Sequence, residues 1–494
     1  MYSQPPPLGG LNTRDDIGNM DKADAAVLEN FFPDTSDVQV RDGCTFFASV
    51  STTANFETIA EFKSPQVDAI IVGSGGKIAC YNDSTNTVLA SGFVKNDWRT
   101  VNFNEQMVLV NGFDAPQRVY HDGSFHCEPA TISGPSAISE IVDAHVFKSR
   151  VFYVLRDSSD FWYTETNAIA GTLTRFPLSR VARGGGKLLT IKSWSVDGGD
   201  GPDDYAVFFM STGEVIVYQG TDPGRSGQWG IVGRFRIPEL VNRRCVYEHA
   251  GKIYCVTVND IVILPDAFQQ PTPPPSKLTG AISADWKRYK TLRGWQFFVH
   301  PQGKKAFINV PTGSQTSYQY VINLQTGSPT KYTGWNTFGF GQWQNKLYFN
   351  PYGTAGLVEA DNGLVDELTS GVDTAITARA EVAPVNLGQQ QYKKLVDYRL
   401  RLISEGTVTI SSGLAYDYKT PDFYFQTTLP TEGTEWGSAW DTEEWSREDF
   451  TKDEWFGASG NGVAVQLRLE LVAPRQTLRW VKTDYRFEMA KQVA

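Results

Sequence analysis

The chain has 494 residues, of which 41% are hydrophobic, 13% are aromatic and 20% are charged. This balance excludes a wholly disordered chain and allows two or three domains, each with its own core. The formal net charge of −10 excludes a generally basic surface of the kind that grips nucleic acid through its phosphates. The 45 glycines and 25 prolines favour short strands joined by turns, so we expect an all-β protein.

The cysteines are odd in number and include no Cys-x-x-Cys pair. This spacing argues against a disulfide framework or a zinc site and suits a reducing cytoplasm, so we expect small buried hydrophobes. The N-terminus has no charged stretch followed by an apolar one, and no apolar run approaches the roughly 18 residues that span a bilayer. We therefore expect neither a secretory signal nor membrane insertion. The cysteines are Cys44, Cys80, Cys127, Cys245 and Cys255.

Residues 1–45 are predicted to form an N-terminal arm with one short helix. Asp21 is positioned to cap the helix, and Pro33 to end it. Apolar residues between them fall on one helical face. This face either docks onto the body of the protein or contacts another subunit, which makes its two phenylalanines candidate interface residues. The face consists of Val27, Leu28, Phe31 and Phe32.

From residue 46 to 370 one local pattern recurs: a turn, then Lys, Arg or Gln, then an apolar strand. Hairpins repeated at intervals of tens of residues are typical of a β-propeller, whose blades stack around an axis. At roughly 40–50 residues per blade, this region predicts some six to eight blades. A pair of β-sandwiches is the alternative. The copies begin at Gly76-Lys77, Glu105-Gln106, Ser149-Arg150, Gly251-Lys252 and Asn345-Lys346.

Residues 371–494 are predicted to form a separate antiparallel β-sandwich, because five segments in this region read as strands and residues 477–487 alternate well. A loop over residues 432–456 interrupts these strands. It holds four tryptophans among nine acidic residues, with only two basic residues, and exposed tryptophans are costly. They either fold back onto the sandwich or dock a partner, so they are candidate interface residues. They are Trp436, Trp440, Trp445 and Trp455.

The sequence offers no catalytic signature. Gly184-Gly185-Gly186-Lys187 is followed by Leu188 where a phosphate-binding loop needs Ser or Thr. Gly73-Ser74-Gly75-Gly76 lies in a predicted hairpin, which has no helix N-terminus to hold a pyrophosphate. The five histidines never occur at metal-ligand spacing, and there is no Gly-x-Ser-x-Gly elbow. We therefore predict no enzyme activity, no catalytic residue, no metal and no cofactor, although paired carboxylates that meet only in space leave sugar hydrolysis open.

Several short segments resemble tail proteins of short-tailed bacteriophages and their prophages. The segments are Leu8–Asp15, Met20-Asp21, Asn30–Asp34, Val38–Gly43, Asp97–Arg99 and Asn111–Gln117, followed by the Trp-rich loop and Leu478-Arg479-Trp480. The resemblance implies a tail nozzle subunit of the propeller type, of which six copies form a tapered tube below the head-to-tail adaptor. Its implied partners are further copies of itself, the adaptor or portal, tail fibres or spikes, and DNA that passes without specific binding. The implied location is the virion tail, after synthesis in the host cytoplasm.

Acidic and neutral side chains along such a tube would repel the phosphates of DNA, so that DNA glides through it. Two other functions stay open. The Trp-rich acidic loop would also suit a carbohydrate-binding or carbohydrate-hydrolysing propeller. A propeller scaffold for cellular partners is the third possibility, although it leaves the arm and the terminal sandwich without a role.

Overall fold

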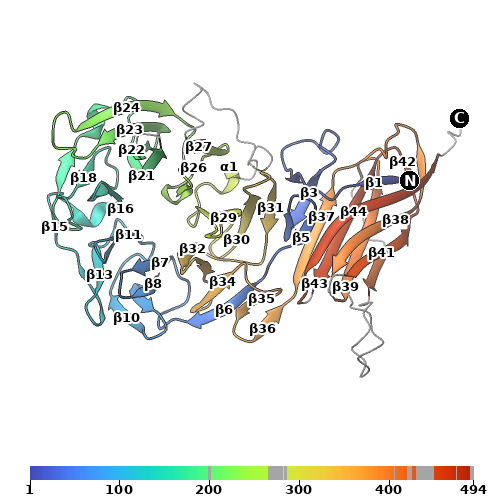
Figure 1. The fold of residues 1–494 in the computed structure, drawn as a ribbon, viewed down its shortest axis with the longest axis horizontal. Helices are drawn as coiled ribbons and strands as arrows, with labels where there is room; N and C mark the ends of the chain where they lie inside the picture. Colours follow the sequence, from blue (N-terminus) through green and yellow to red (C-terminus); the bar gives the residue numbers. More distant parts are fainter. Residues whose placement is uncertain are drawn as a thin grey trace.

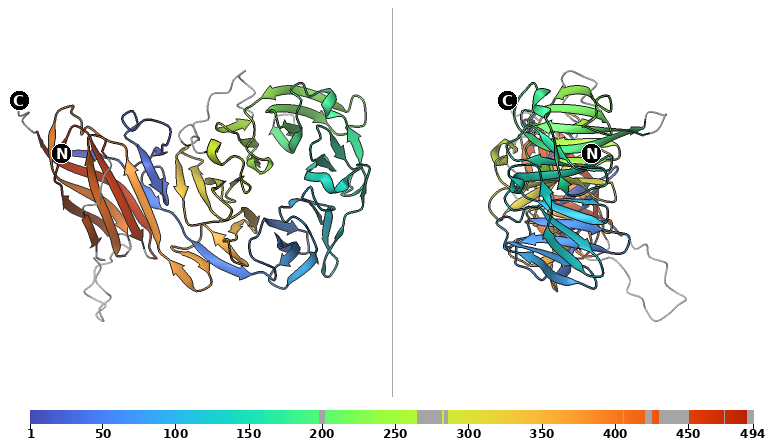
Figure 2. Two further views of the ribbon diagram at one scale, coloured as in Figure 1. Left: turned by 180° about the vertical axis from the view of Figure 1, so that it is seen from behind. Right: turned by 90° about the vertical axis from the view of Figure 1, so that its left-hand side faces the viewer.

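The computed structural model describes residues 1–494 except 198–201, 265–281, 283–285, 405, 420–424, 430–449, 474 and 490–494. It consists of a ring of sheets beside a two-sheet sandwich, with β3 (Asp24–Glu29) between the two (Figure 1). The N-terminus lies at the far end of the sandwich. The views from behind and from the side show the ring as a flat disc (Figure 2). The predicted all-β propeller is confirmed.

In the described residues the ring contains six four-stranded blades and one three-stranded blade. This total of seven blades lies within the predicted range of six to eight. Blades one and two consist of β7 (Thr58–Lys63), β8 (Asp68–Ser74), β9 (Lys77–Tyr81) and β10 (Asn86–Ser91), and of β11 (Arg99–Phe103), β12 (Gln106–Val110), β13 (Gln117–His121) and β14 (Phe125–Pro129). Blades three and four consist of β16 (Ile141–Phe147), β17 (Arg150–Leu155), β18 (Phe161–Tyr163) and β20 (Thr174–Phe176), and of β21 (Leu188–Asp197), β22 (Pro202–Met210), β23 (Glu214–Gly220) and β24 (Trp229–Arg236). Blades five and six consist of β25 (Val246–His249), β26 (Lys252–Val256) and β27 (Ile261–Leu264), and of β28 (Gln296–Val299), β29 (Lys305–Pro311), β30 (Ser317–Asn323) and β31 (Pro329–Tyr332). Blade seven consists of β32 (Phe340–Trp343), β33 (Lys346–Phe349), β34 (Gly356–Ala360) and β6 (Cys44–Ser49).

The repeated sequence pattern corresponds to two-residue hairpin turns. At Asn104-Glu105, between β11 and β12, both residues have positive φ, of 49° and 60°. This is the backbone that a type I′ turn requires, and its twist matches the twist of the flanking strands. The same turn joins the first two strands of blades three, five and seven. In blade one this turn is Gly75-Gly76, and it joins the second strand, β8, to the third, β9.

The ring is closed by a strand from the beginning of the chain. β6 pairs antiparallel with β34 from Gly356↔Ser49 to Ala360↔Cys44, which completes blade seven. Apolar side chains fill the space between successive blades. Phe62 and Ile71 of blade one, for example, pack with Met107 of blade two. Because β6 is followed directly by β7 of blade one, its pairing with β34 ties blade seven to blade one.

The sandwich consists of two sheets whose inner faces form one core. The first contains β2 (Gly10–Leu11), β3 (Asp24–Glu29), β37 (Ile376–Val382), β43 (Val465–Ala473), β39 (Val408–Tyr416) and β40 (Phe425–Leu429). The second contains β1 (Tyr2–Gln4), β4 (Phe31–Pro33), β5 (Val38–Val40), β44 (Leu478–Met489), β38 (Lys393–Ser404), β41 (Phe450–Gly457) and β42 (Asn461–Gly462). In β38 buried and more exposed residues alternate along most of the strand, and Tyr398 on its inner face hydrogen-bonds Ser412 of the opposite sheet at 2.6 Å. This period of two is the pattern of a sheet with one face in a core.

The predicted helix in the arm is wrong, because residues 24–29 and 31–33 form β3 and β4. β3 pairs with β37 of the sandwich and, at Glu29↔Lys331, with β31 of blade six, so one continuous sheet joins the sandwich to the propeller. The arm is therefore part of both modules. The remaining short elements are β15 (Ile132–Ser133), β19 (Gly171–Thr172), β35 (Asp366–Thr369), β36 (Val372–Thr374), the single α-helical turn α1 (Trp286–Tyr289) and the 3-10 turns η1 (Ile138–Glu140), η2 (Leu178–Arg180) and η3 (Arg243–Cys245).

Candidate functional site

The two phenylalanines predicted as interface residues are buried inside the chain. Phe31 has no exposed surface and packs against Trp480 with ring centroids 6.2 Å apart. Phe32 is 4% exposed and packs among residues of blades six and seven, with the ammonium group of Lys305 4.9 Å from its ring centroid. Neighbouring residues of a strand point to opposite faces, so the two rings enter different cores. The interface prediction is wrong for both, and they join the arm to the body.

Of the four tryptophans, Trp436, Trp440 and Trp445 lie outside the described residues, so their role stays a prediction. Trp455 is in β41 and not in a loop, which corrects the predicted loop boundary because the strand begins at residue 450. Its ring is half-buried between two guanidinium groups, with Arg399 at 4.9 Å and Arg486 at 4.0 Å from the centroid. Such cation–π contacts each contribute about 0.5–1 kcal/mol at exposed sites.

The same outer face of the second sheet carries a row of arginine–aspartate pairs. Adjacent strands place Arg399 within 2.6 Å of Asp484 and Arg401 within 2.8 Å of Asp453. Arg401 and Asp453 meet in a bidentate pair, which favours planar geometry. Because the charges of this row compensate one another, the face is polar without a strong net sign.

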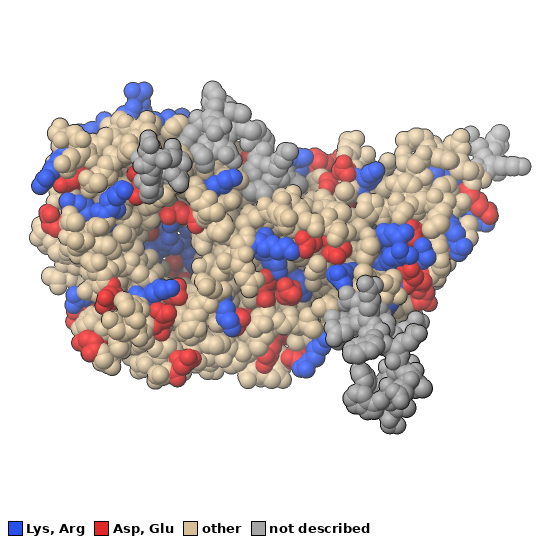
Figure 3. Space-filling view, in the orientation of Figure 1, with Lys and Arg blue, Asp and Glu red and all other residues tan. Residues whose placement is uncertain are grey.

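Charged side chains also meet at one end of the propeller axis, where the innermost strands begin. Arg244, just before β25, lies 3.4 Å from Asp97, which precedes β11. Arg293, before β28, lies 2.9 Å from Glu57, before β7, and 3.7 Å from Asp97. These pairs join blades that are not neighbours in the ring, so their side chains cross the axis. Basic and acidic atoms are visible inside the central hollow (Figure 3).

Further along the axis, three cations surround one buried carboxylate. Asp143 of β16 is 3% exposed and lies 3.3 Å from Arg99. Burial alone would raise the pKa of Asp143, but Arg99, Arg243 and Lys192 outweigh it, and the pKa lies below its usual range. Burial lowers the pKa of Arg243, and burial together with Lys192 lowers the pKa of His145 to about 3. His145 is therefore neutral at pH 7, and its ring hydrogen-bonds a serine hydroxyl of β21 at 2.7 Å.

A buried ion pair lies where the arm, the propeller and β35 meet. The guanidinium of Arg41, whose side chain is 1% exposed, donates to both carboxylate oxygens of Asp366 at 2.9 and 2.6 Å. It also donates to the side chain of Asn30 at 2.9 Å and to the carbonyl of Thr333 at 3.1 Å. The indole of Trp335 donates to Asp366 at 3.0 Å, and its ring lies 4.5 Å from the guanidinium carbon. The arm is thus held to segments about 300 residues later in the sequence by one group of hydrogen bonds around Arg41.

The cysteines behave as expected: four are buried, Cys127 is half-buried and all are free thiols. Burial raises the pKa of Cys80, Cys127 and Cys245 to about 12, so these thiols stay protonated. In the described ranges, no group of three or more His, Cys, Asp or Glu residues could hold a metal ion. Among the same residues, no helix has the length and apolar character needed to cross a bilayer.

The axial charges and the Arg41 pair were not predicted from the sequence. A signal for the axial charges exists: Glu57, Asp97, Arg244 and Arg293 each come within a few residues of the start of an innermost strand. In a propeller these strand starts converge on the axis, so charges at that position meet. The Arg41 pair has no such signal in the sequence, because Arg41 and Asp366 are 325 positions apart and meet only once the arm is folded against the propeller.

No protein-family model and no curated protein matches this chain. Among solved structures, the WD40 β-propeller domain of Doa1 is similar over 64% of this chain and 96% of its own, with 11% identity and a TM-score of 0.39. BBS1N, solved in complex with ARL6DN, is similar over 65% of this chain and 96% of its own, with 9% identity and a TM-score of 0.41. A candidate 6-phosphogluconolactonase of Bacteroides fragilis is similar over 57% and 87%, with 12% identity and a TM-score of 0.39. Likenesses this distant carry no inference about what this chain does.

Proposed function

We propose that the chain is a structural subunit of the tail of a short-tailed bacteriophage, in a six-membered ring that forms the nozzle for DNA exit. The observation that carries the proposal is the position of residues 1–43 in the fold, between the sandwich and the propeller. This segment holds the largest share of the resemblance to tail proteins, and its strands pair with the sandwich at β44 and β37 and with the propeller at β31. A body tied together in this way resists bending between its modules, which suits a part that transmits load.

Under this proposal, DNA does not travel along the axis of one propeller. The pairs of Arg244 with Asp97 and of Arg293 with Glu57 cross that axis, and opening them would expose charges held in a partly buried site. The exit tube is instead enclosed by surfaces of several copies, as closed rotational symmetry allows. The net charge of −10 supports passage without binding, because a tube that is not basic does not hold phosphates.

The partners in this proposal are further copies of the chain, the head-to-tail adaptor or portal above the ring, and fibres or spikes beside it. The role needs no catalysis and no cofactor. The carbohydrate-related alternative drew on the Trp-rich acidic segment. Its one described tryptophan, Trp455, is half-buried and its ring is already in contact with two arginines, so this residue does not favour a sugar site.

The proposal is tested by locating the chain in phage particles. Antibodies raised against the purified chain are applied, with gold-labelled secondary antibody, to particles from a lysate of the source culture and imaged by electron microscopy. We expect gold at the distal end of short tails. Mass spectrometry of the same purified particles gives the copy number relative to the major capsid protein.

Antibody pre-absorbed with the purified chain is the control for specific labelling. Gold that is absent from every particle, with the chain free in the soluble lysate, would contradict the tail role. Binding of the free chain on a glycan array would then favour the carbohydrate-related alternative.

A further inference from the structure

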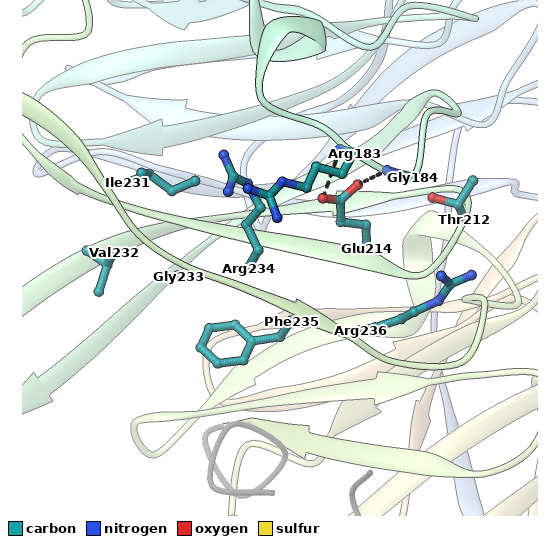
Figure 4. A pocket seen from close by; sticks show the side chains of 10 residues that line it. All are labelled: Arg183, Gly184, Thr212, Glu214, Ile231, Val232, Gly233, Arg234, Phe235 and Arg236. Carbon is teal, nitrogen blue, oxygen red and sulfur yellow. Dashed lines mark hydrogen bonds between the residues drawn. The ribbon is translucent and has the colours of Figure 1, made fainter. Parts of the chain in front are cut away.

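A pocket of about 690 Å³ lies at the outer edge of blade four. One wall is the edge strand β24, which pairs with β23 and with no other strand of the described chain. The opposite wall is the turn that contains Arg183 and Gly184, and Glu214 of β23 lies between the two walls (Figure 4). The pocket is remote in sequence and in the fold from the arm and from the sandwich (Figure 1).

Three arginines line this pocket: Arg183, Arg234 and Arg236. Among the described residues, no Asp or Glu oxygen comes within 4.0 Å of any of these guanidinium groups, whereas most other arginines of the chain have such a partner. Glu214 is the one acidic residue of the lining, and its two oxygens accept the backbone N–H groups of Arg183 at 3.1 Å and Gly184 at 2.7 Å. Three positive charges therefore face one negative charge that is already hydrogen-bonded to the backbone.

One donor of the pocket is both buried and unsatisfied. The Nε atom of Arg234 has almost no solvent-accessible surface and has no hydrogen-bond partner in the described structure. Leaving a buried charged donor without a partner costs more than about 1–3 kcal/mol, so each such group calls for an explanation, such as a water or an ion held beside it. An arginine fork is suited to bidentate binding of a carboxylate or phosphate.

The surface beside the pocket is apolar. Ile231 and Val232 of β24 are 39% and 55% exposed, and a side chain added at Gly230 would meet no atom within 4 Å. Exposed aliphatic side chains next to a cationic pocket fit a protein segment better than the polar backbone of a nucleic acid. The negative charge of the whole chain also disfavours nucleic acid.

The edge of β24 is not flat. Its pairing with β23 shifts register between Val217↔Gly233 and Tyr218↔Ile231, which makes Val232 the extra residue of a β-bulge. Bulges bend an edge and hinder the addition of a further strand. Recognition at this site therefore depends on side chains and not on strand pairing.

We propose that this pocket binds an acidic segment of a protein partner. Two or three carboxylates of the segment pair with Arg183, Arg234 and Arg236, and flanking apolar residues cover Ile231 and Val232. This inference does not depend on the proposed tail role, because it rests on the composition of the pocket alone.

The test measures binding of a fluorescein-labelled peptide of alternating Glu and Val residues to the full chain by fluorescence anisotropy. The variants Arg183→Gln, Arg234→Gln and Arg236→Gln are each expected to weaken binding roughly tenfold, as the loss of one charge-assisted pair implies. Arg180→Gln is the matched control, since Arg180 is an exposed arginine nearby that does not line the pocket, and it should leave binding unchanged. Circular dichroism of each variant verifies that the fold is intact.

Three competitors separate the possible ligands. A Lys and Val peptide of the same length should not compete, and neither inorganic phosphate nor a single-stranded oligonucleotide should displace the acidic peptide at equal concentration. Equal or stronger binding of the oligonucleotide would overturn the choice of a protein partner. Peptide binding that the three variants leave unchanged, or that does not saturate, would overturn the site.

Discussion

Replacement of Asp366 by asparagine removes the carboxylate that pairs with the buried guanidinium of Arg41 while it keeps the side-chain volume. Arg41 then remains charged at a position where its side chain is 1% exposed. Removing one partner of a buried, hydrogen-bonded ion pair costs about 3–5 kcal/mol, because the other charge is left uncompensated. We expect a loss in that range, since the variant also weakens the bond from Trp335 to the carboxylate.

The measurement is urea-induced unfolding at pH 7, followed by tryptophan fluorescence and by circular dichroism. Asp453→Asn is the control, because its pair with Arg401 has the same bidentate form but is about one-third exposed on both sides. Such exposed pairs contribute at most about 1 kcal/mol. The double variant Arg41→Met with Asp366→Leu should be closer to the wild type than Asp366→Asn, because it leaves no buried charge. A loss below about 1 kcal/mol for Asp366→Asn would refute the reasoning.

Three further changes test other parts of the structure. The pKa of His145 is about 3 in the folded chain and near 6.5 in the unfolded chain, so the unfolded chain takes up a proton first as the pH falls. The contribution of His145 to the free energy of unfolding is therefore complete above pH 6.5 and declines by about 2 kcal/mol between pH 6.5 and 5. The urea midpoint of His145→Gln should depend less on pH over that interval than that of the wild type. Gly43→Ala places a Cβ atom 1.9 Å from the carbonyl oxygen of Val365 and should cost about 3 kcal/mol in the same assay, whereas Gly457→Ala, with no atom within 4 Å of its added carbon, should change little. Trp455→Ala removes the ring between two arginines and should cost about 1–2 kcal/mol by thermal unfolding, and a phenylalanine that recovers none of it would contradict the cation–π contribution.

The propeller was predictable because its signal is local. Each two-residue turn of the repeated hairpins directly precedes the strand that follows it, as at Asn104-Glu105 and Gln344-Asn345. The arm was predicted wrongly because two buried strands imitated a helix. Leu28 and Phe31 have the spacing of a helical stripe, yet Asn30 between them has a φ of 55°, which ends β3 before β4 begins. The side chain of Asn30 is held by residues more than 300 positions away, which no local pattern reveals.

The interaction sites were less predictable than the fold, for the same reason. Arg183, Arg234 and Arg236 come from two separate segments, and nothing in either segment marks the arginines as unpaired. Only the structure distinguishes Arg175, which pairs with Asp160, from Arg183, which lines the pocket. The predicted aromatic residues, in contrast, were prominent in the sequence because of their size. Size favours burial as strongly as binding, which is why Phe31 and Phe32 are in cores.

The route of the first residues has consequences for how the chain reaches this structure. β6 closes the propeller only after β34 exists, and Tyr2 pairs with Tyr485, whose hydroxyl donates to Gln4 at 3.0 Å across 481 positions. Contacts between such distant segments form slowly, since the closure of long loops precedes any gain from the contact. Until then the edges of β34 and β44 are open to pairing with other chains. Once the arm is in place, the propeller cannot open at blade seven without releasing β6, and the sandwich cannot separate from it without breaking β3 and the Arg41 pair. Residues 1–49 therefore supply buried side chains such as Phe31 and Phe32 to both cores, and they also make the two modules one mechanical unit.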